Sequence, residues 1–259
     1  MRIMLVGDVV GRTGRRAFRT HTPKLRAEQR IDVVIVNGEN AAGGKGYTRK
    51  ALDELYAGGA DVVTSGNHVW DKKEVFSFIE DEPFLVRPAN YPEGTPGQGY
   101  CIFPFKAHSI AVINLSGRSF MPPLDCPFQK MEEILSAIEG KADLVVLDFH
   151  AETTSEKLAM GYAFDGRADI IVGTHTHVQT ADAQILPGGT AYITDLGMVG
   201  AHMSILGVRS DLVIKKFRTG MPVRFEMAEG NAEYAAVIVD VDHRMKVTAI
   251  ERVMLYEGQ

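Results

Sequence analysis

The chain contains a series of short, unbroken apolar runs rich in Val, Ile and Leu, and this pattern restricts its fold more than any other feature. Apolar runs without polar alternation are typical of strands that are buried on both faces, as in a parallel sheet covered by helices. Helix-like stretches separate several of the runs, which favours a mostly parallel sheet in the first 80 residues. The runs lie in the segments RIMLVGD, DVVIVNGEN, DVVTSGN, SIAVINLSG, DLVVLDFHA, DIIVGTHTH and TAYITDLG.

The remaining pattern predicts helices and a second, partly antiparallel sheet. In residues 85–115 and 184–255 strand-like segments follow one another through Gly and Pro turns, and we expect little helix there. The last two segments flank Asp242 and His243 and predict an antiparallel hairpin. We therefore expect an α/β fold with two mixed sheets stacked on each other and helices outside, as a single domain over residues 1–259. The expected helices are residues 13–29, 48–57, 71–80, 127–139 and 155–164.

Length, charge and cysteine content exclude several classes of protein. A chain of 259 residues buries a large core without disulfides. The 28 Lys and Arg against 33 Asp and Glu give a net charge of −5, which argues against coating long nucleic acid or an anionic membrane. Cys101 and Cys126 show no C-x-x-C spacing, so we expect a reducing cytoplasm. Asp8 interrupts the first apolar run, so we expect neither a signal peptide nor a membrane span.

Five of the apolar runs end in residues that are able to bind a metal ion. Ligands of α/β proteins bind outside the carboxyl ends of the strands, where side chains that follow different strands converge. We therefore expect the polar residues at these ends to lie close together. They are Asp8, Glu39, Asn40, Asn67, His68, His150, His175 and His177.

Each of these residues also has a structural explanation when it is considered alone. Asp8 fits a turn or a helix N-cap, Glu39 fits a Gly-rich turn, and His150 fits the edge of a core. The pair His175 and His177 is harder to explain in this way. In an extended segment their side chains point to the same side, which is typical of metal binding.

Taken together, the set indicates a two-metal site. Carboxylates, amides and imidazoles without a thiolate suit divalent Mn, Fe, Co or Zn. Seven candidate ligands exceed the needs of one ion, so two ions that share a bridging carboxylate are expected. Two such ions hold the oxygens of a phosphoryl group and generate hydroxide near neutral pH. His68, next to the candidate ligand Asn67, is the candidate general acid for the leaving oxygen.

The motifs resemble those of the YmdB-like branch of the calcineurin-like metallophosphoesterase superfamily, and the resemblance extends over nearly the whole chain. It implies a four-layer α/β/β/α sandwich and a phosphodiesterase with cyclic nucleotides among its substrates. It also implies two divalent metal ions, usually Mn or Fe, with Zn, Co or Mg as alternatives. The motifs are GDVVGRTGR, NGENAAGGKG, GNHVWDKKE, DFHAETTSEK and GTHTHVQTAD, followed by TDLGM and TGMPVRFE.

One departure from the superfamily pattern affects the implied ligands. Most members carry D-x-H at the first strand, whereas this chain has Val10 at the position of that histidine. The resemblance implies that Glu39 bridges the two ions, that Asn40 replaces the lost ligand, and that His68 is the proton donor. It assigns Asp8, Glu39, Asn40 and His177 to one ion, and Glu39, Asn67, His150 and His175 to the other.

We therefore expect a cytoplasmic dinuclear-metal phosphodiesterase that attacks a small phosphodiester or nucleotide with a metal-bridging hydroxide. Neither a membrane nor a long nucleic acid is expected as a partner, and a homo-oligomer is left open. A phosphomonoesterase and a nucleotide-binding regulator without turnover are the alternatives. An amidohydrolase also uses an H-x-H pair, but on the first strand of a barrel, whereas here the pair comes late.

Four further residues have two explanations each. Thr174 and Thr176 flank the first imidazole of the H-T-H segment and either contact phosphate or serve as ordinary strand residues. Glu152 either orients a metal ligand or is solvated at the surface. His202 follows the TDLGM segment and is the best candidate for an additional substrate contact.

Overall fold

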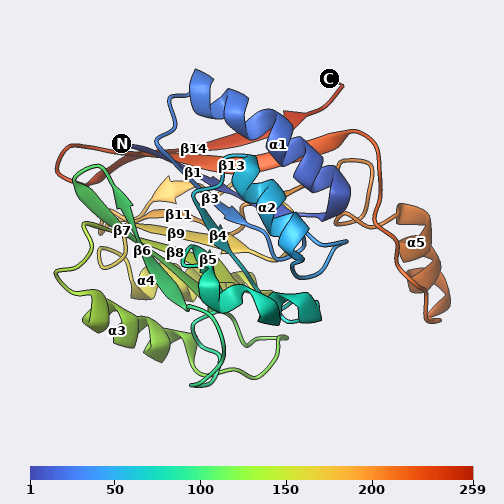
Figure 1. Ribbon diagram of the computed structural model, residues 1–259, viewed down its shortest axis with the longest axis horizontal. Coiled ribbons are helices and arrows are strands. Elements are labelled where there is room, and N and C mark those ends of the chain that lie inside the picture. Colours follow the sequence, from blue (N-terminus) through green and yellow to red (C-terminus); the bar gives the residue numbers. More distant parts are fainter. Residues whose placement is uncertain (259) are drawn as a thin grey trace.

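Two stacked sheets form the centre of the protein, and the larger of them carries both the N-terminal and the C-terminal strands (Figure 1). The computed structural model describes residues 1–258. The first sheet has the order β2-β12-β13-β1-β3-β4-β5, with β14 paired to β13. Its strands are β1 (Arg2–Val6), β2 (Asp8–Val9), β3 (Val33–Asn37), β4 (Val62–Thr64), β5 (Leu85–Val86), β12 (Met198–Ala201), β13 (Ala232–Val241) and β14 (Val247–Tyr256).

The second sheet has the order β10-β11-β9-β8-β7-β6. Its four central strands are parallel, whereas both edge strands are antiparallel to their neighbours. In the first sheet, β1, β3, β4 and β5 are parallel and β13 and β14 form the predicted antiparallel hairpin. Both sheets are therefore mixed, as predicted. The strands are β6 (Tyr100–Phe105), β7 (His108–Ser116), β8 (Leu144–His150), β9 (Ile170–Thr174), β10 (Gln184–Ile185) and β11 (Ala191–Ile193).

Helices cover the outer face of each sheet and complete four α/β/β/α layers (Figure 1). The first sheet packs against α1 (Gly11–Glu28) and α2 (Arg49–Ala57), and the second against α3 (Pro127–Ile138) and α4 (Thr154–Ala163). This arrangement confirms the predicted fold class. No helix within residues 1–258 has both the length and the apolar character needed to cross a membrane.

The unbroken apolar runs are explained by strands whose two faces each pack into a hydrophobic core. In β1, Ile3 and Leu5 point into the core between the sheets, while Met4 and Val6 pack against the helices. All four side chains are at most 1% exposed. Because neither face meets water, no position of such a strand favours a polar residue, and each buried aliphatic side chain contributes about 1.5–3 kcal/mol. Polar residues are therefore displaced to the strand ends.

The predicted helix over residues 71–80 is wrong. Two short 3₁₀ turns, η1 (Lys73–Ser77) and η2 (Ile79–Asp81), occupy this segment. Val75 and Ile79 are both buried and lie four residues apart, a spacing that also suits an α-helix. Phe78, however, has φ −143° and separates the two turns.

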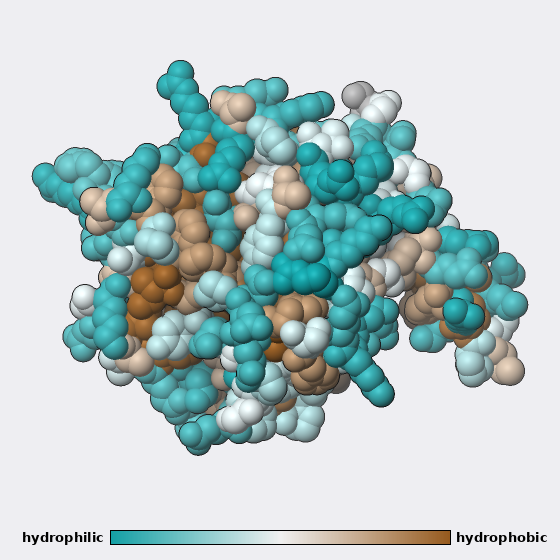
Figure 2. All heavy atoms as spheres, viewed as in Figure 1, coloured by the Kyte–Doolittle hydropathy of each residue, from teal (hydrophilic) through white to brown (hydrophobic). Residues whose placement is uncertain are grey.

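The expectation of little helix in residues 184–255 is also wrong, because α5 (Ser210–Thr219) lies in this region. Figure 1 shows α5 standing apart from the two sheets at the end of an extended excursion. Only Val213 of this helix is buried, while Ile214 and Phe217 are exposed. Figure 2 shows hydrophobic atoms among hydrophilic ones in the protruding part of the molecule that α5 forms in Figure 1. Val213, Ile214 and Phe217 share one face of α5, so the sequence does contain a helical pattern here that the expectation overlooked.

Candidate metal centre

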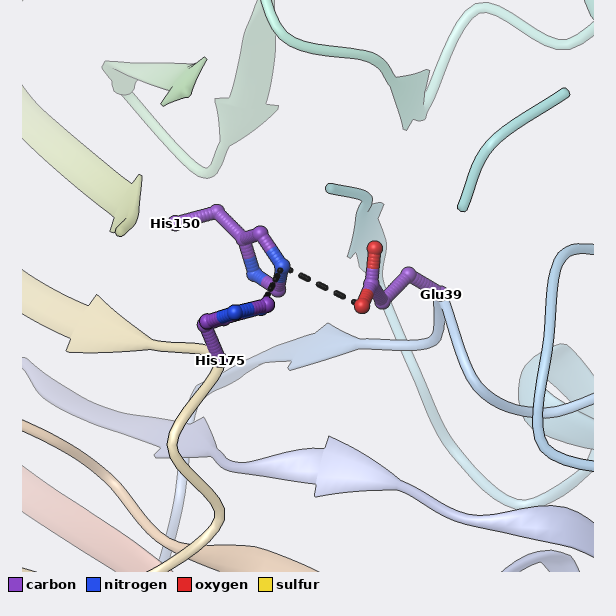
Figure 3. Close-up of side chains that lie close together, drawn as sticks. All are labelled: Glu39, His150 and His175. Atoms are coloured by element: carbon purple, nitrogen blue, oxygen red, sulfur yellow. Dashed lines mark hydrogen bonds and ion pairs between the residues drawn. The ribbon is translucent and has the colours of Figure 1, made fainter. Parts of the chain in front are cut away.

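The structure brings the predicted residues together at one edge of the two sheets. They come from five connections: Asp8 opens β2, the Glu39 turn follows β3, the Asn67 loop follows β4, His150 ends β8, and the H-T-H segment follows β9. Figure 3 shows side chains from both sheets pointing toward one another. The convergence follows from the topology, because parallel strands of each sheet end at this edge.

Glu39, His150, His175 and Asn67 form the tightest part of the cluster. The candidate ligand atoms of Glu39, His150 and His175 all lie within 4.8 Å of one another. Nε2 of His150 lies 3.1 Å from Oε1 of Glu39, 3.0 Å from Nδ1 of His175 and 3.0 Å from Oδ1 of Asn67. These four residues are the set that the family resemblance assigned to one ion.

Asp8, Asn40 and His177 are the remaining candidate ligands, and two of them carry buried oxygens without donors. Within residues 1–258, Oδ1 of Asp8 and Oδ1 of Asn40 have no hydrogen-bond partner. A buried acceptor left unsatisfied costs about 1–3 kcal/mol, so two of them on neighbouring turns fit a cation. Nε2 of His177 lies 3.9 Å from Oδ1 of Asp8. The donor set at this edge therefore suits divalent metal ions.

The H-T-H segment is not extended, which corrects one step of the sequence argument. β9 ends before it, and His175 and His177 have φ of +99° and +63°. A positive φ is unfavourable for residues with a Cβ and persists where surrounding contacts impose it. The amide of His175 donates to Oδ2 of Asp8 at 3.2 Å. The two imidazoles therefore reach the site through a bent turn, not through the alternation of a strand.

A buried ion pair holds the turn in place, and the sequence analysis did not identify it. Nζ of Lys157, on α4, lies 2.7 Å from Oδ2 of Asp195. The same oxygen accepts hydrogen bonds from the amide (3.1 Å) and the hydroxyl (2.7 Å) of Thr176, between the two histidines. The amide of Gly197 donates to the other oxygen. Thr176 therefore anchors the turn, and the Asp in the TDLG string directly after β11 is the signal that could have found this pair.

A second polar network orients His150 from behind. Oγ1 of Thr174 lies 2.9 Å from Nδ1 of His150 and donates to Oδ1 of Asp148 at 2.7 Å. Because the hydroxyl has one hydrogen, it accepts from Nδ1–H of His150 and leaves Nε2 to face Glu39. Asn37 and Thr64 of the first sheet also donate to Asp148. A charged residue inside the buried run LVVLDFH is the sequence signal for this network.

Burial and neighbouring charges set the protonation of the cluster in the absence of an ion. Burial, together with the charge of His150, lowers the pKa of His175 to about 3, and burial lowers that of His177. Both imidazoles are thus neutral, as metal ligands must be. For Glu39 and His150, mutual attraction outweighs burial, so the pKa of the carboxyl falls and that of the imidazole rises. Burial raises the pKa of Asp8. A cation at this site must displace the proton on His150.

His68 occupies a position that suits a proton donor. Its Nδ1 lies 3.0 Å from Oδ2 of Asp71, and its amide donates to Oε2 of Glu39 at 3.0 Å. The carboxylate of Asp71 therefore holds one ring nitrogen, and the other nitrogen, Nε2, is left for exchange of a proton with a substrate.

The cluster opens into a cleft of about 280 Å³. Glu152 lies on its wall, and its Oε2 is 3.0 Å from Nε2 of His175, although the carboxylate is half exposed. Thr176 also lines the cleft, whereas Thr174 is buried behind His150 and does not. The lining residues are Glu39, Asn40, His68, Glu152, His175, Thr176, His177 and Leu206.

Gly66 is required by the close approach of its backbone to the cluster. A Cβ at this position would lie 2.2 Å from Oε2 of Glu39 and 2.4 Å from Nε2 of His150. Real Cβ atoms do not approach other heavy atoms so closely, and neither side chain is free to move in the buried cluster. The Gly of the GNH string thus makes room for the candidate ligands.

Comparisons with known proteins identify the family. The family model described as YmdB-like protein matches residues 4–253. The chain is 52% identical to the 2′,3′-cyclic-nucleotide 2′-phosphodiesterase of Bacillus subtilis (strain 168), over 98% of this chain and 97% of that protein. A hypothetical protein from Thermus thermophilus has a solved structure with TM-score 0.94 and 43% identity, covering 100% of both chains. A solved phosphatase from Mycoplasma pneumoniae has TM-score 0.94 and 36% identity, covering 99% of this chain and 93% of that one. The chain therefore belongs to the YmdB-like family.

Proposed function

We propose that this protein is a metal-dependent phosphodiesterase that hydrolyses small phosphodiesters, with 2′,3′-cyclic nucleotides as its principal substrates. The observation that carries the proposal is the convergence of Glu39, His150 and His175 beside the buried, partnerless oxygens of Asp8 and Asn40. The name of the Bacillus subtilis relative, at 52% identity, supports the same activity and substrate class.

We propose that the candidate ligands hold two divalent ions with Glu39 shared between them, and that Mn or Fe is preferred for this N/O donor set. When bound, such a pair offsets the charge on phosphoryl oxygens and supplies hydroxide near neutral pH. The proposed ligands are Asp8, Glu39, Asn40 and His177 for one ion, and Glu39, Asn67, His150 and His175 for the other.

The surrounding residues hold the candidate metal ligands in fixed orientations. The hydrogen bonds that link Asp148, Thr174 and His150 direct Nε2 of His150 into the site. Asp195 fixes the turn that carries His175. Because these supports are buried, the ligands are held in place before a substrate arrives, and little rearrangement is needed in the reaction.

His68 is proposed to protonate the leaving oxygen. Opening a 2′,3′-cyclic phosphate breaks the bond to one ribose oxygen, which leaves as an alkoxide unless a proton is delivered. Asp71 accepts from Nδ1 of His68 and orients the ring, so Nε2 is the nitrogen proposed to deliver the proton. A protein that only binds nucleotides has no use for this donor, which favours an enzyme over the regulatory alternative.

The test is a screen of the purified protein against 2′,3′-cyclic and 3′,5′-cyclic nucleotides, bis(4-nitrophenyl) phosphate and phosphomonoesters. Turnover of the 2′,3′-cyclic nucleotides should require Mn or Fe, stop after chelation and return when metal is restored. His68→Asn should lower kcat on these substrates by about 10²–10⁴-fold. The matched control is His243→Asn, at an exposed turn residue between β13 and β14. Unchanged turnover after complete metal removal would contradict the proposal, and tight binding without turnover would favour the regulator.

A further inference from the structure

A second hollow of about 310 Å³ adjoins the catalytic cleft. The two hollows share His177 and Leu206, so a molecule that reaches from one into the other passes these two side chains. The second hollow contains His202, Glu233 and Tyr256, which the proposed chemistry does not use. His202 is the residue that the sequence indicated as an additional substrate contact.

The walls of the second hollow combine flat rings with a carboxylate. The rings of His202 and Tyr256 have centroids 4.6 Å apart at an interplanar angle of 57°. Nδ1 of His202 lies 2.8 Å from Oε2 of Glu233, so the carboxylate fixes the orientation of the imidazole. Met198 and Met254 supply apolar surface next to these groups. Flat apolar walls beside one hydrogen-bond acceptor are the features that a heterocyclic base requires.

The Leu206 loop forms the divide between the two hollows. Leu206 is 45% exposed, and its φ of +54° is unfavourable for a leucine. Paired hydrogen bonds between Ile205 and Val208 hold the loop, and the carbonyl of Leu206 accepts from Nδ1 of His177 at 3.3 Å. A strained, exposed apolar residue that is fixed directly to a candidate metal ligand fits a contact with substrate.

We propose that the second hollow is the nucleobase subsite, and that it selects nucleotides over other small phosphodiesters. This inference rests on the proposed function, because it places the phosphate in the cleft. The base then stacks on Tyr256 and His202, and the ribose lies against Leu206. Glu233 accepts hydrogen bonds from N–H groups of the base.

The carboxylate also predicts a base preference. Guanine presents two adjacent N–H donors, from its ring nitrogen and its exocyclic amino group. Adenine and cytosine present one amino group, whereas uracil flanks its single N–H with two carbonyl oxygens that a carboxylate repels. The subsite should therefore favour guanine most and uracil least.

The experiment compares guanosine 2′,3′-cyclic phosphate with the base-free ribose 2′,3′-cyclic phosphate, using the metal-replete protein. The KM of the nucleotide should be about 5- to 150-fold lower, which corresponds to the about 1–3 kcal/mol that stacking contributes per base. Tyr256→Ala should raise the KM of the nucleotide toward that of the base-free ester, and Tyr256→Phe, which keeps the ring, should restore it. Equal KM values in the unaltered protein, or an equal rise for both esters in Tyr256→Ala, would overturn the proposal.

A second variant and a binding measurement separate the two levels of inference. Glu233→Gln should reduce the ratio of kcat/KM between guanosine and uridine 2′,3′-cyclic phosphates, while His243→Asn should leave it unchanged; an unaltered ratio in Glu233→Gln would reject the assigned acceptor. Equilibrium dialysis with guanosine 3′-monophosphate and ribose 3-phosphate measures the binding affinity of the subsite without turnover. Preferential binding of the nucleotide without hydrolysis of either ester supports the subsite and contradicts the proposed activity. Hydrolysis of both esters without any preference supports the proposed activity and contradicts the subsite.

Discussion

Replacing Lys157 with Met removes the positive partner of a buried carboxylate and should affect both stability and the metal centre. Lys157 is 2% exposed and Asp195 is fully buried, so water cannot compensate for the lost charge. Removing one member of a buried ion pair typically costs about 3–5 kcal/mol. The donors of Thr176 and Gly197 remain and satisfy the oxygens of Asp195 in part, which places the expected loss at about 3 kcal/mol.

The effect on metal binding follows from the position of Asp195. This carboxylate binds both the amide and the hydroxyl of Thr176, whose neighbours are the candidate ligands His175 and His177. Without Lys157, the carboxylate that anchors the turn loses its charged partner, and the spacing of the two imidazoles becomes less strictly fixed. We therefore expect weaker Mn binding in isothermal titration calorimetry, together with a lower midpoint of urea unfolding.

Two further proteins complete this experiment. Lys24→Met changes the same residue type at an exposed position of α1 and should alter neither property. Lys157→Met combined with Asp195→Asn removes both charges and should recover part of the unfolding free energy lost in the single variant. A loss of unfolding free energy below about 1 kcal/mol for Lys157→Met would refute the role given to this pair. A double-mutant cycle that shows no coupling energy between Lys157 and Asp195 would refute it as well.

Three further predictions concern the cluster itself. Gly66→Ala should abolish Mn binding and hydrolysis while far-UV circular dichroism stays unchanged, because the new Cβ would displace Glu39 and His150; retention of metal would contradict this packing. Glu39→Gln should lower the occupancy of both ions in elemental analysis, and loss of one ion alone would reject the bridging assignment. In the metal-free protein, attraction to Glu39 outweighs burial and raises the pKa of His150 from 6.5 to about 9, so its stabilising effect is complete below pH 6.5 and disappears as the pH rises through 9. The free energy of unfolding should therefore fall by up to about 3 kcal/mol between pH 6.5 and 9.5, and His150→Gln should show no such fall.

The sheets and the candidate site could be predicted because burial on both faces leaves a simple pattern. In strands such as β1 and β3 nearly every position is apolar, so the first polar residue after the apolar run marks the strand end. Since parallel strands end at one edge, Asp8, His150 and the H-T-H segment could be placed together without coordinates. The α2 helix was equally readable, because the hydroxyl of Thr48 caps it and it ends at Gly58.

Most of the remaining features depend on contacts that no local pattern records. The positive φ of His175 and His177 is imposed by partners distant in sequence, so the two imidazoles reach the site by a route that strand periodicity does not describe. Lys157 resembles any solvated helix residue until the fold places Asp195 against it. In α5 the spacing of Val213, Ile214 and Phe217 was a local signal for a helix, but only Val213 joins the core, so the segment was not recognised among the strands around it.

The most direct test of the central claim is a titration of the metal-free protein with Mn, followed by single-turnover hydrolysis of a 2′,3′-cyclic nucleotide. If the strand-end cluster is a two-metal phosphodiesterase site, the rate constant should rise with added Mn and reach its plateau at two ions per chain. The same titration of Glu39→Gln should show no such rise. Hydrolysis that proceeds without metal, or a plateau at a single ion, would contradict the account.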